Sequence, residues 1–224
     1  MTYEPTLDDY IQQLLHGPNP SVRQNAAFIL GRQRDMRVIA PLIHAADDID
    51  ATVRMRAVEA LGAWKNYPEA THAVLQAFTD ADEIVRAQAA RSLGLMQDAS
   101  VFDALIPGLR DESVTVRAKT AEALGSLGAI EAVMPLLQTL IEDQDGSVRY
   151  FAQESLVQIG GLQSREAVSQ AISNYQDNPG ILIDLISVLG RLPDTRNRDL
   201  LETLLSHSDG DIRAMAQWAI DEMK

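Results

Sequence analysis

The feature that most constrains this chain is a ten-residue segment that recurs at nearly constant spacing. It first appears as VRQNAAFILG, which begins at Val22, and a close copy, VRMRAVEALG, begins at Val53. The remaining copies, which diverge toward the end of the chain, begin at Val85, Val116, Val148, Ile181 and Ile212. Successive copies start 31 to 33 residues apart, and a period of about 20–50 residues is typical of stacked structural repeats. The sequence therefore predicts seven similar units.

Each unit is predicted to contain two helices. Apolar or small residues lie at offsets 0, +4, +7 and +8 of the repeated segment, which is one face of a helix. Shorter amphipathic runs precede the segments, with Pro41 and Pro135 near the start of two of them, where a missing N–H costs little. Residues 6–16 supply the first helix, with Thr6 as its N-cap. We therefore expect an all-α fold, a right-handed α-solenoid of about seven helical pairs without strands.

The whole chain, residues 1–224, is predicted to form a single repeat array. Its units are expected at about 6–34, 35–66, 67–98, 99–128, 129–160, 161–193 and 194–224. A glycine closes the repeated segment in five of them, and we expect each of these glycines to end its helix in the left-handed conformation. These glycines are Gly31, Gly62, Gly94, Gly125 and Gly190.

An arginine follows the leading apolar residue of most units, and an acidic residue often lies five positions before that apolar residue. The arginines are Arg23, Arg54, Arg86, Arg117, Arg149 and Arg213, and the acidic residues are Asp48, Asp80, Asp111 and Asp143. Anion binding or acid–base chemistry is one interpretation of such a pair. One residue type at one register, however, faces the same neighbouring loop in every unit. We therefore interpret these residues, the arginine ladder, as ion pairs and loop caps between adjacent repeats.

Composition excludes several other classes of function. The net charge of −13 disfavours nucleic acid and anionic membranes, because such binding depends on basic residues. The absence of cysteine excludes disulfides, thiolate metal sites and a cysteine nucleophile. The four histidines, His16, His44, His72 and His207, lie far apart in different registers, so we expect solvent-facing or capping roles. We predict no catalytic, cofactor-binding or metal-binding residue.

The beginning of the chain and its hydropathy suggest a location. MTYEPTLDDY lacks the apolar core of a signal peptide, and no apolar run approaches the roughly 18–20 residues of a membrane span. We therefore expect a soluble, cytoplasmic protein without membrane insertion.

A partner is expected on the exposed side of the second helices, which lines the concave surface of such arrays. In the early units these offsets include Ala87, Arg91 and Ala118, and they also carry the spaced pairs Arg56–Glu59 and Lys119–Glu122. Opposite charges three residues apart on a helix are typical of a solvated, internally paired face. Arg56, Arg91 and Lys119 are therefore only secondary candidates for partner contacts.

The last three units carry apolar and aromatic residues at the same offsets. The candidate partner-binding residues are Tyr150, Phe151, Glu154, Ile183, Met215 and Trp218. Aromatic and methionine enrichment with few charges is typical of interface cores. Two alternatives remain: Trp218 folds back to cover the terminal unit, or the repeats have simply diverged, as Leu182 at the arginine register suggests.

The repeat itself resembles a known family. The pattern V-R-x-x-A-A-x-x-L-G, the short period and the preceding aspartate are similar to HEAT-like repeats across essentially the whole chain. The alanine-rich second helix resembles the type found in cyanobacterial phycobilin lyases and their phycobilisome-degradation relatives. Members of that group attach or detach bilins on phycobiliprotein cysteines, commonly as two-subunit complexes, or dock on phycobiliproteins without evident chemistry. The resemblance supplies no catalytic residue.

Three functions follow as expectations. The first is a protein-binding scaffold or adaptor whose folded partner is a phycobiliprotein, a phycobilisome or a second HEAT-like subunit. The second is a subunit of a bilin lyase, in which case the reacting thiol belongs to the substrate protein. The third is an adaptor in iron–sulfur assembly, with the metal ligands on the partner.

Overall fold

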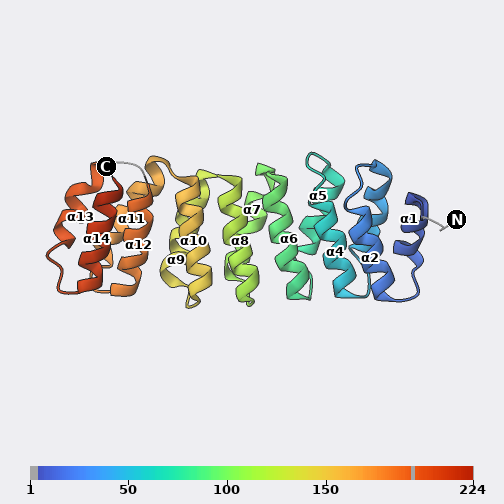
Figure 1. Ribbon diagram of the computed structural model, residues 1–224, viewed down its shortest axis with the longest axis horizontal. Coiled ribbons are helices and arrows are strands. Elements are labelled where there is room, and N and C mark those ends of the chain that lie inside the picture. Colours follow the sequence, from blue (N-terminus) through green and yellow to red (C-terminus); the bar gives the residue numbers. More distant parts are fainter. Residues whose placement is uncertain (1–4, 193–194, 224) are drawn as a thin grey trace. The chain divides into compact units, whose positions relative to one another are not determined.

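The computed structural model describes residues 5–192 and 195–223, and within these ranges every secondary-structure element is a helix (Figure 1). The prediction of an all-α fold of helical pairs is confirmed. In chain order the elements, with 3₁₀ helices written η, are α1 (Leu7–His16), α2 (Pro20–Leu30), η1 (Met36–Val38), α3 (Ile39–Ala45), α4 (Ala51–Leu61), α5 (Pro68–Ala77), α6 (Glu83–Met96), η2 (Ala99–Val101), α7 (Phe102–Leu105), η3 (Ile106–Arg110), α8 (Val114–Leu127), η4 (Ile130–Ala132), α9 (Val133–Glu142), α10 (Gly146–Ile159), α11 (Gly161–Asn174), α12 (Pro179–Arg191), η5 (Thr195–Asn197), α13 (Arg198–Leu204) and α14 (Gly210–Glu222).

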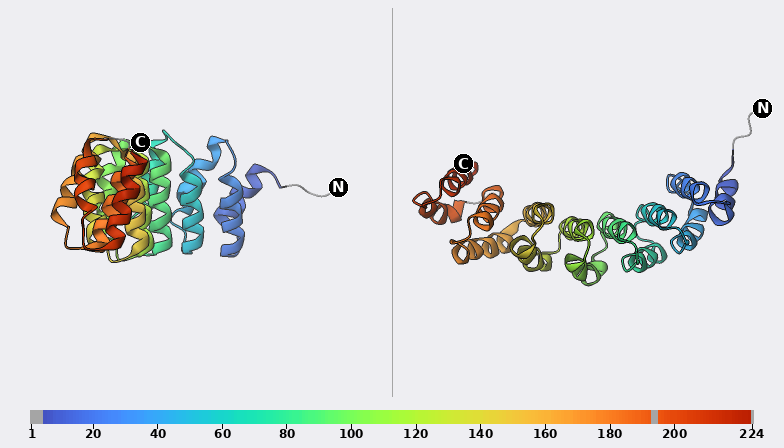
Figure 2. Two further views of the ribbon diagram at one scale, coloured as in Figure 1. Left: turned by 60° about the vertical axis from the view of Figure 1, so that its left-hand side comes forward. Right: turned by 90° about the horizontal axis from the view of Figure 1, so that it is seen from below.

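The helices belong to two compact units, Met1–Ala123 and Leu124–Lys224, with the boundary inside α8. Within the first unit, α2, α4 and α6 pack side by side as one layer, and α1, α3 and α5 form a second layer (Figure 2). Within the second unit, α10, α12 and α14 form one layer, and α9 and α11 lie in the other. None of the described helices has both the length and the apolar character of a membrane span.

Short polar side chains fix where the helices begin. Thr6 and Asp9 form a reciprocal capping box on α1, which confirms the predicted N-cap. Asp50 and Asp82 cap α4 and α6 by accepting hydrogen bonds from backbone N–H groups of the first turn. Asn178 does the same for α12. The loops between first and second helices therefore supply caps as well as ladder carboxylates.

The first helix of the fourth repeat is interrupted, although its amphipathic run is continuous in the sequence. The run over residues 101–109 forms the short helix α7 and continues as η3, with Pro107 in the first turn of η3. Pro107 has no N–H for an α-helical bond, which explains the change. Gly108 then passes close to α8, because a Cβ added there would lie 2.6 Å from Thr120 Oγ1.

The prediction that five glycines end helices in the left-handed conformation is wrong. Gly31 and Gly62 have φ of −62° and −58°, and the other three lie inside helices without positive φ. They allow neighbouring helices to approach instead. A Cβ on Gly94 would lie 2.8 Å from Ala123 Cα, and one on Gly190 would lie 2.9 Å from Ala219 Cα. Left-handed glycines occur after these segments, as at Gly128 with φ of +66°.

Candidate partner-binding face

Three arginines of the first unit form bidentate ion pairs with an aspartate of the following repeat. Nε and Nη2 of Arg54 lie 2.7 Å from the two carboxylate oxygens of Asp80. The corresponding distances are 2.6 and 2.8 Å for Arg23 with Asp48. They are 2.8 and 3.0 Å for Arg86 with Asp111. All six side chains are 10–17% exposed, so water screens these pairs only partly.

The remaining guanidinium nitrogen, Nη1, holds the loop that precedes its own helix. It donates to Asp80 O at 2.8 Å in Arg86 and to Asp111 O at 3.0 Å in Arg117. In the second unit it donates to Asp143 O at 3.2 Å in Arg149. Arg213 makes the same bond, to His207 O at 2.7 Å. Each arginine therefore ties its own loop, and the three bidentate arginines also join that loop to the next.

These contacts lower the pKa of the paired loop aspartates. Burial by itself raises the pKa of the Asp80 carboxyl. Hydrogen bonds from Arg54 and from the Asp82 N–H, together with the charge of Arg54, outweigh burial, so the pKa lies below its usual range. The same balance lowers the pKa of Asp48 and Asp111. The geometry does not support acid–base chemistry at these carboxylates, because they are held ionised and are paired with arginine.

The second unit uses a different ion pair between α10 and α12. Arg149 Nε lies 3.1 Å from Asp184 Oδ2, which belongs to α12 and not to a loop. Arg191 on α12 donates to both carboxylate oxygens of Glu154 on α10, with Nη2–Oε2 at 2.8 Å. Hydrogen bonds from Arg191 lower the pKa of Glu154. Their effect outweighs that of partial burial, which raises this pKa. Leu182, at the arginine register, is fully buried.

Three of the predicted partner-binding residues meet in one groove between α12 and α14. The groove has a volume of about 560 Å³ and is lined by Ile183, Met215 and Trp218, with Ser187, Asp211 and Ala214 at its sides. All three predicted side chains are half-buried, so each contributes both packing and an accessible surface. The groove is thus apolar at its centre and carries a single carboxylate.

The other three predicted residues lie on α10. Tyr150 is 54% exposed, and its ring meets that of Phe151 edge to face, with centroids 5.5 Å apart. Glu154 is committed to Arg191. Because α10 packs against α12, Tyr150 and Phe151 lie on the same helical layer as the groove without lining it. We call Tyr150, Phe151, Ile183, Met215 and Trp218 the aromatic face.

Trp218 packs against the repeat that precedes its own. A Cβ added to Gly190 would lie 2.9 Å from Trp218 Cζ3, so the indole lies against the α12 backbone. The indole nevertheless lines the groove. Trp218 therefore both packs against α12 and contributes to the groove surface.

The secondary candidates in the first unit are mostly engaged within their own helices. Arg56 Nη1 lies 2.6 Å from Glu59 Oε2, and Lys119 Nζ lies 2.7 Å from Glu122 Oε2. Arg91 is exposed. Ala87 and Ala118, which were expected to be exposed, are instead buried, with exposed fractions of 7% and 5%.

The first unit also presents an aromatic residue among cations. Phe28 is 47% exposed, and the guanidinium carbons of Arg32 and Arg56 lie 5.5 and 6.0 Å from its ring centroid. No signal in the sequence indicates the two arginines around this ring.

The histidines remain separate in the structure. His16, His44 and His72 are exposed, and His207 Nδ1 accepts a hydrogen bond from Asp209 N at 3.0 Å. Among the residues that the structure describes, no three His, Asp or Glu side chains come together as a set of metal ligands.

The family model for HEAT repeats matches residues 7–86, 71–157 and 133–221. The chain belongs to the HEAT-repeat family. Its sequence is 25% identical over 229 residues to the uncharacterized phycocyanin operon protein Z of Pseudanabaena tenuis, covering 98% of this chain and 96% of that protein. It is 28% identical over 145 residues to the phycocyanobilin lyase subunit alpha of a Picosynechococcus strain, covering 57% of this chain and 54% of the subunit.

A different enzyme shares part of the sequence. Deoxyhypusine hydroxylase of Arabidopsis thaliana is 32% identical over 133 residues, which is 58% of this chain and 42% of that enzyme. The phycocyanin operon protein is thus matched end to end, whereas each of these two enzymes is matched over about half of its length or less.

Solved structures share the helical-repeat architecture. The complex of CpcE and CpcF of phycocyanin lyase from Nostoc gives a TM-score of 0.61 at 23% identity, covering 100% of this chain and 96% of the matched chain. Kap95p in its complex with RanGDP gives 0.74 at 14% identity, covering 97% of this chain and 34% of Kap95p. At these identities the likeness establishes the fold. The HEAT-repeat chain is related in sequence to phycobilin lyase subunits and phycocyanin operon proteins.

Proposed function

We propose that this protein is a protein-binding HEAT-repeat scaffold that docks on a phycobiliprotein through its aromatic face. We choose a phycobiliprotein as the partner because the chain matches a phycocyanin operon protein from end to end. The aromatic face carries the choice of surface, because it combines an exposed tyrosine with a groove lined by Ile183, Met215 and Trp218. Interface cores are enriched in such residues and depleted in charge.

The ion pairs between α10 and α12 support a docking role. Arg149–Asp184 and Arg191–Glu154 pair four charged side chains on the two helices that carry Tyr150, Phe151 and Ile183. A charge that is already paired within the chain does not need a counter-charge on the partner. The surface that remains for contact is therefore mainly apolar, with Asp211 at the side of the groove.

The proposal is tested by measuring the affinity for purified phycocyanin by biolayer interferometry. Tyr150→Ala should weaken binding by about 2 kcal/mol, roughly thirtyfold, if the tyrosine is a hot spot. Met215→Ala should also weaken binding. Phe28→Ala is the matched control, since Phe28 is a comparably exposed aromatic residue of the first unit, and its affinity should stay at the wild-type value. Normal melting and normal binding of both test variants would place the contact elsewhere.

A second candidate function is that of a bilin lyase subunit. In that case the chain would dock on a phycobiliprotein in the same way and would also take part in attaching or detaching its bilin. Sequence similarity to a phycocyanobilin lyase subunit favours it. The discriminating experiment incubates apo-phycocyanin with phycocyanobilin and a second HEAT-like subunit, with and without this chain. Visible absorbance that stays on denatured phycocyanin only when this chain is present identifies a lyase subunit. Binding of phycocyanin without chain-dependent attachment identifies a scaffold.

A further inference from the structure

The first unit separates its basic residues from its acidic ones. The helices α2, α4 and α6, which pack side by side, contain five arginines and only two acidic residues, Glu59 and Glu83. The chain as a whole has the opposite balance, with 32 acidic and 19 basic residues. The exposed side of this helical layer therefore differs in charge from the rest of an acidic protein.

Two exposed arginines of this layer have no counter-charge within the described chain. Arg91 lies on α6, and Arg32 follows the end of α2. Across residues 5–192 and 195–223, neither guanidinium has a carboxylate partner. The ladder arginines of the same helices, in contrast, are paired with loop aspartates. Arg32 and Arg91 therefore remain for a carboxylate that comes from another molecule.

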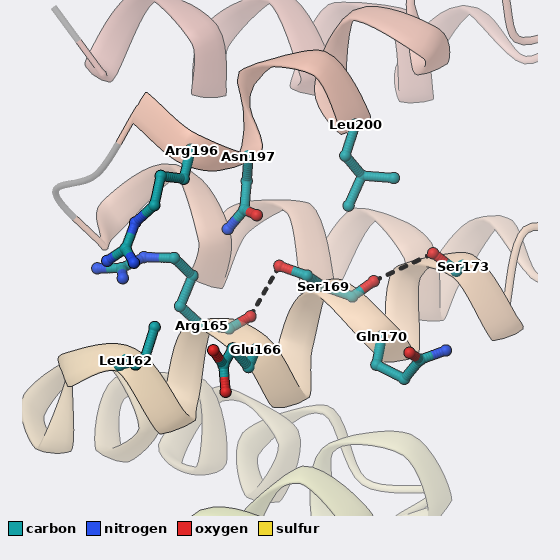
Figure 3. A pocket seen from close by; sticks show the side chains of 9 residues that line it. All are labelled: Leu162, Arg165, Glu166, Ser169, Gln170, Ser173, Arg196, Asn197 and Leu200. Carbon is teal, nitrogen blue, oxygen red and sulfur yellow. Dashed lines mark hydrogen bonds between the residues drawn. The ribbon is translucent and has the colours of Figure 1, made fainter.

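The arginines at a surface pocket of the second unit are not equivalent to these two. Arg165 and Arg196 line the pocket between α11 and η5 that is shown in Figure 3. Both already have an interaction partner. The two arginines of the first unit are thus the better basis for an interaction with an external anion.

The ring of Phe28 holds two guanidinium groups on this side of the layer. Their carbon atoms lie 5.5 Å from the ring centroid for Arg32 and 6.0 Å for Arg56. Arg56 Nη1 also lies 2.6 Å from Glu59 Oε2, so this arginine is fixed from two directions. Because the contacts join α2 to α4, the packing of two helices positions the cations before any partner arrives, which reduces the entropy lost on binding.

Apolar side chains accompany the cations at the same registers. On α2 and just beyond it, Phe28 and Arg32 occupy offsets +6 and +10 of the repeated segment, and on α6 the same offsets carry Arg91 and Leu95. Phe28 is 47% exposed and Leu95 is 53% exposed. Each end of the layer therefore combines one unpaired arginine with one large apolar side chain. We call Phe28, Arg32, Arg56, Arg91 and Leu95 the basic face.

We propose that the basic face binds an acidic segment of a partner protein. Carboxylates of the segment contact Arg32 and Arg91, and its apolar side chains pack on Phe28 and Leu95. Packed helices lie about 8–10 Å apart, so the distance from α2 to α6 is roughly 20 Å, which about six extended residues span. A short segment suits this face better than nucleic acid, because the net charge of −13 opposes a long polyanion.

This proposal goes beyond docking on a phycobiliprotein and does not depend on it. The aromatic face belongs to the other compact unit, and it is tested with phycocyanin and with Tyr150→Ala. The basic face is tested with a peptide and with arginine variants. Either proposal can therefore fail while the other holds.

The test measures the fluorescence anisotropy of a rhodamine-labelled peptide of six glutamates and two leucines as the chain is added. We expect saturable binding that weakens as salt rises, because exposed ion pairs are screened. Arg32→Gln and Arg91→Gln should each weaken the affinity roughly threefold, and the double variant roughly tenfold. Arg110→Gln is the matched control. Arg110 is also exposed and has no carboxylate partner among the described residues, but it ends η3, so this variant removes the same charge and should bind as the wild type does.

Four results would overturn the proposal. They are the absence of saturable peptide binding by the folded wild type, the same loss of affinity in Arg110→Gln as in Arg91→Gln, tighter binding of an eight-nucleotide single-stranded DNA than of the peptide, and self-association of the chain that the double variant abolishes. The third result would assign the face to nucleic acid and the fourth to a second copy of this chain. Far-UV circular dichroism establishes that each variant is folded, and the single variants keep the test valid if the double variant unfolds.

Discussion

Arg149 on α10 donates to Asp184 on α12 at 3.1 Å, although its counterparts in the first unit pair with aspartates in loops. The pair has side chains that are 32% and 23% exposed, compared with 10–17% in the first unit. The second pair across the same helices, Arg191–Glu154, is 34% exposed on both sides. Exposed ion pairs stabilise a fold weakly and are screened by salt. The contact between α10 and α12 is therefore held in a different way from the contacts in the first unit.

This difference predicts local stability along the chain. Amide hydrogen exchange in α11 and α12 should be faster than in α4 and α6, and added salt should widen the gap because it screens Arg149–Asp184 and Arg191–Glu154. Exchange measured by mass spectrometry at low and high salt checks this. Equal protection in both regions at both salt concentrations would contradict it.

The arginine ladder predicts a difference between two equivalent arginines. Arg86→Ala leaves the Asp111 carboxylate buried without its partner and should lower the free energy of unfolding by about 1–3 kcal/mol. Arg213→Ala is the matched control, because within the described part of the chain the Arg213 side chain donates hydrogen bonds only to carbonyls of its own loop. Its effect on urea unfolding should be clearly smaller. Equal losses for the two variants would show that the loop carbonyls, and not the carboxylate pair, provide the stability.

The lowered pKa of Asp80 predicts how acid unfolds the first unit. A carboxyl whose pKa is lower in the folded than in the unfolded protein stabilises the fold fully above its ordinary value of 3.8. This contribution disappears as the pH falls through the lower folded value. Asp80→Asn should therefore reduce stability at neutral pH and make the loss of stability below about pH 4 shallower. Thermal melting across the acid range measures it, and a curve parallel to that of the wild type would contradict it.

The close helix crossings predict opposite effects for two glycine substitutions. Gly94→Ala should destabilise the protein by about 1–3 kcal/mol, because its Cβ would lie 2.8 Å from Ala123 Cα. Gly180→Ala, also in a helix, should stabilise it by about 0.5–1 kcal/mol, since the nearest atom to its Cβ is 3.9 Å away. Chemical unfolding of both variants gives the signs. Stabilisation by Gly94→Ala would mean that α6 and α8 separate at little cost.

Much of the fold follows from the sequence because it repeats. Periodic apolar offsets predicted the helical pairs, and Thr6 was recognisable as a cap because a threonine stands at the start of the first helical run. Gly94 was misinterpreted because a glycine near a helix end has the same local sequence whether it turns the chain or admits a neighbour. Asp184 was missed as an ion-pair partner because it lies within a helix and not at the loop register of Asp48.

The candidate site was predictable only in part. Ile183, Met215 and Trp218 lie at offsets +2, +3 and +6 of the repeated segment, which share one face of a helix, so the sequence placed them on one side of the array. The pocket that Arg165 and Asn197 line was not predictable, because these residues come from segments that no periodic signal relates.

The close glycine contacts between second helices involve other positions than the side chains that these helices expose. At Gly94 with Ala123, and at Gly190 with Ala219, second helices approach through main-chain atoms and single methyl groups, and the Trp218 indole adds to the second crossing. The glycine–alanine contacts contain no side-chain torsions to rearrange when residues elsewhere on the helix change. The outward positions of α10, α12 and α14 are thus free to diversify for a new partner while the helices that carry them keep their separation.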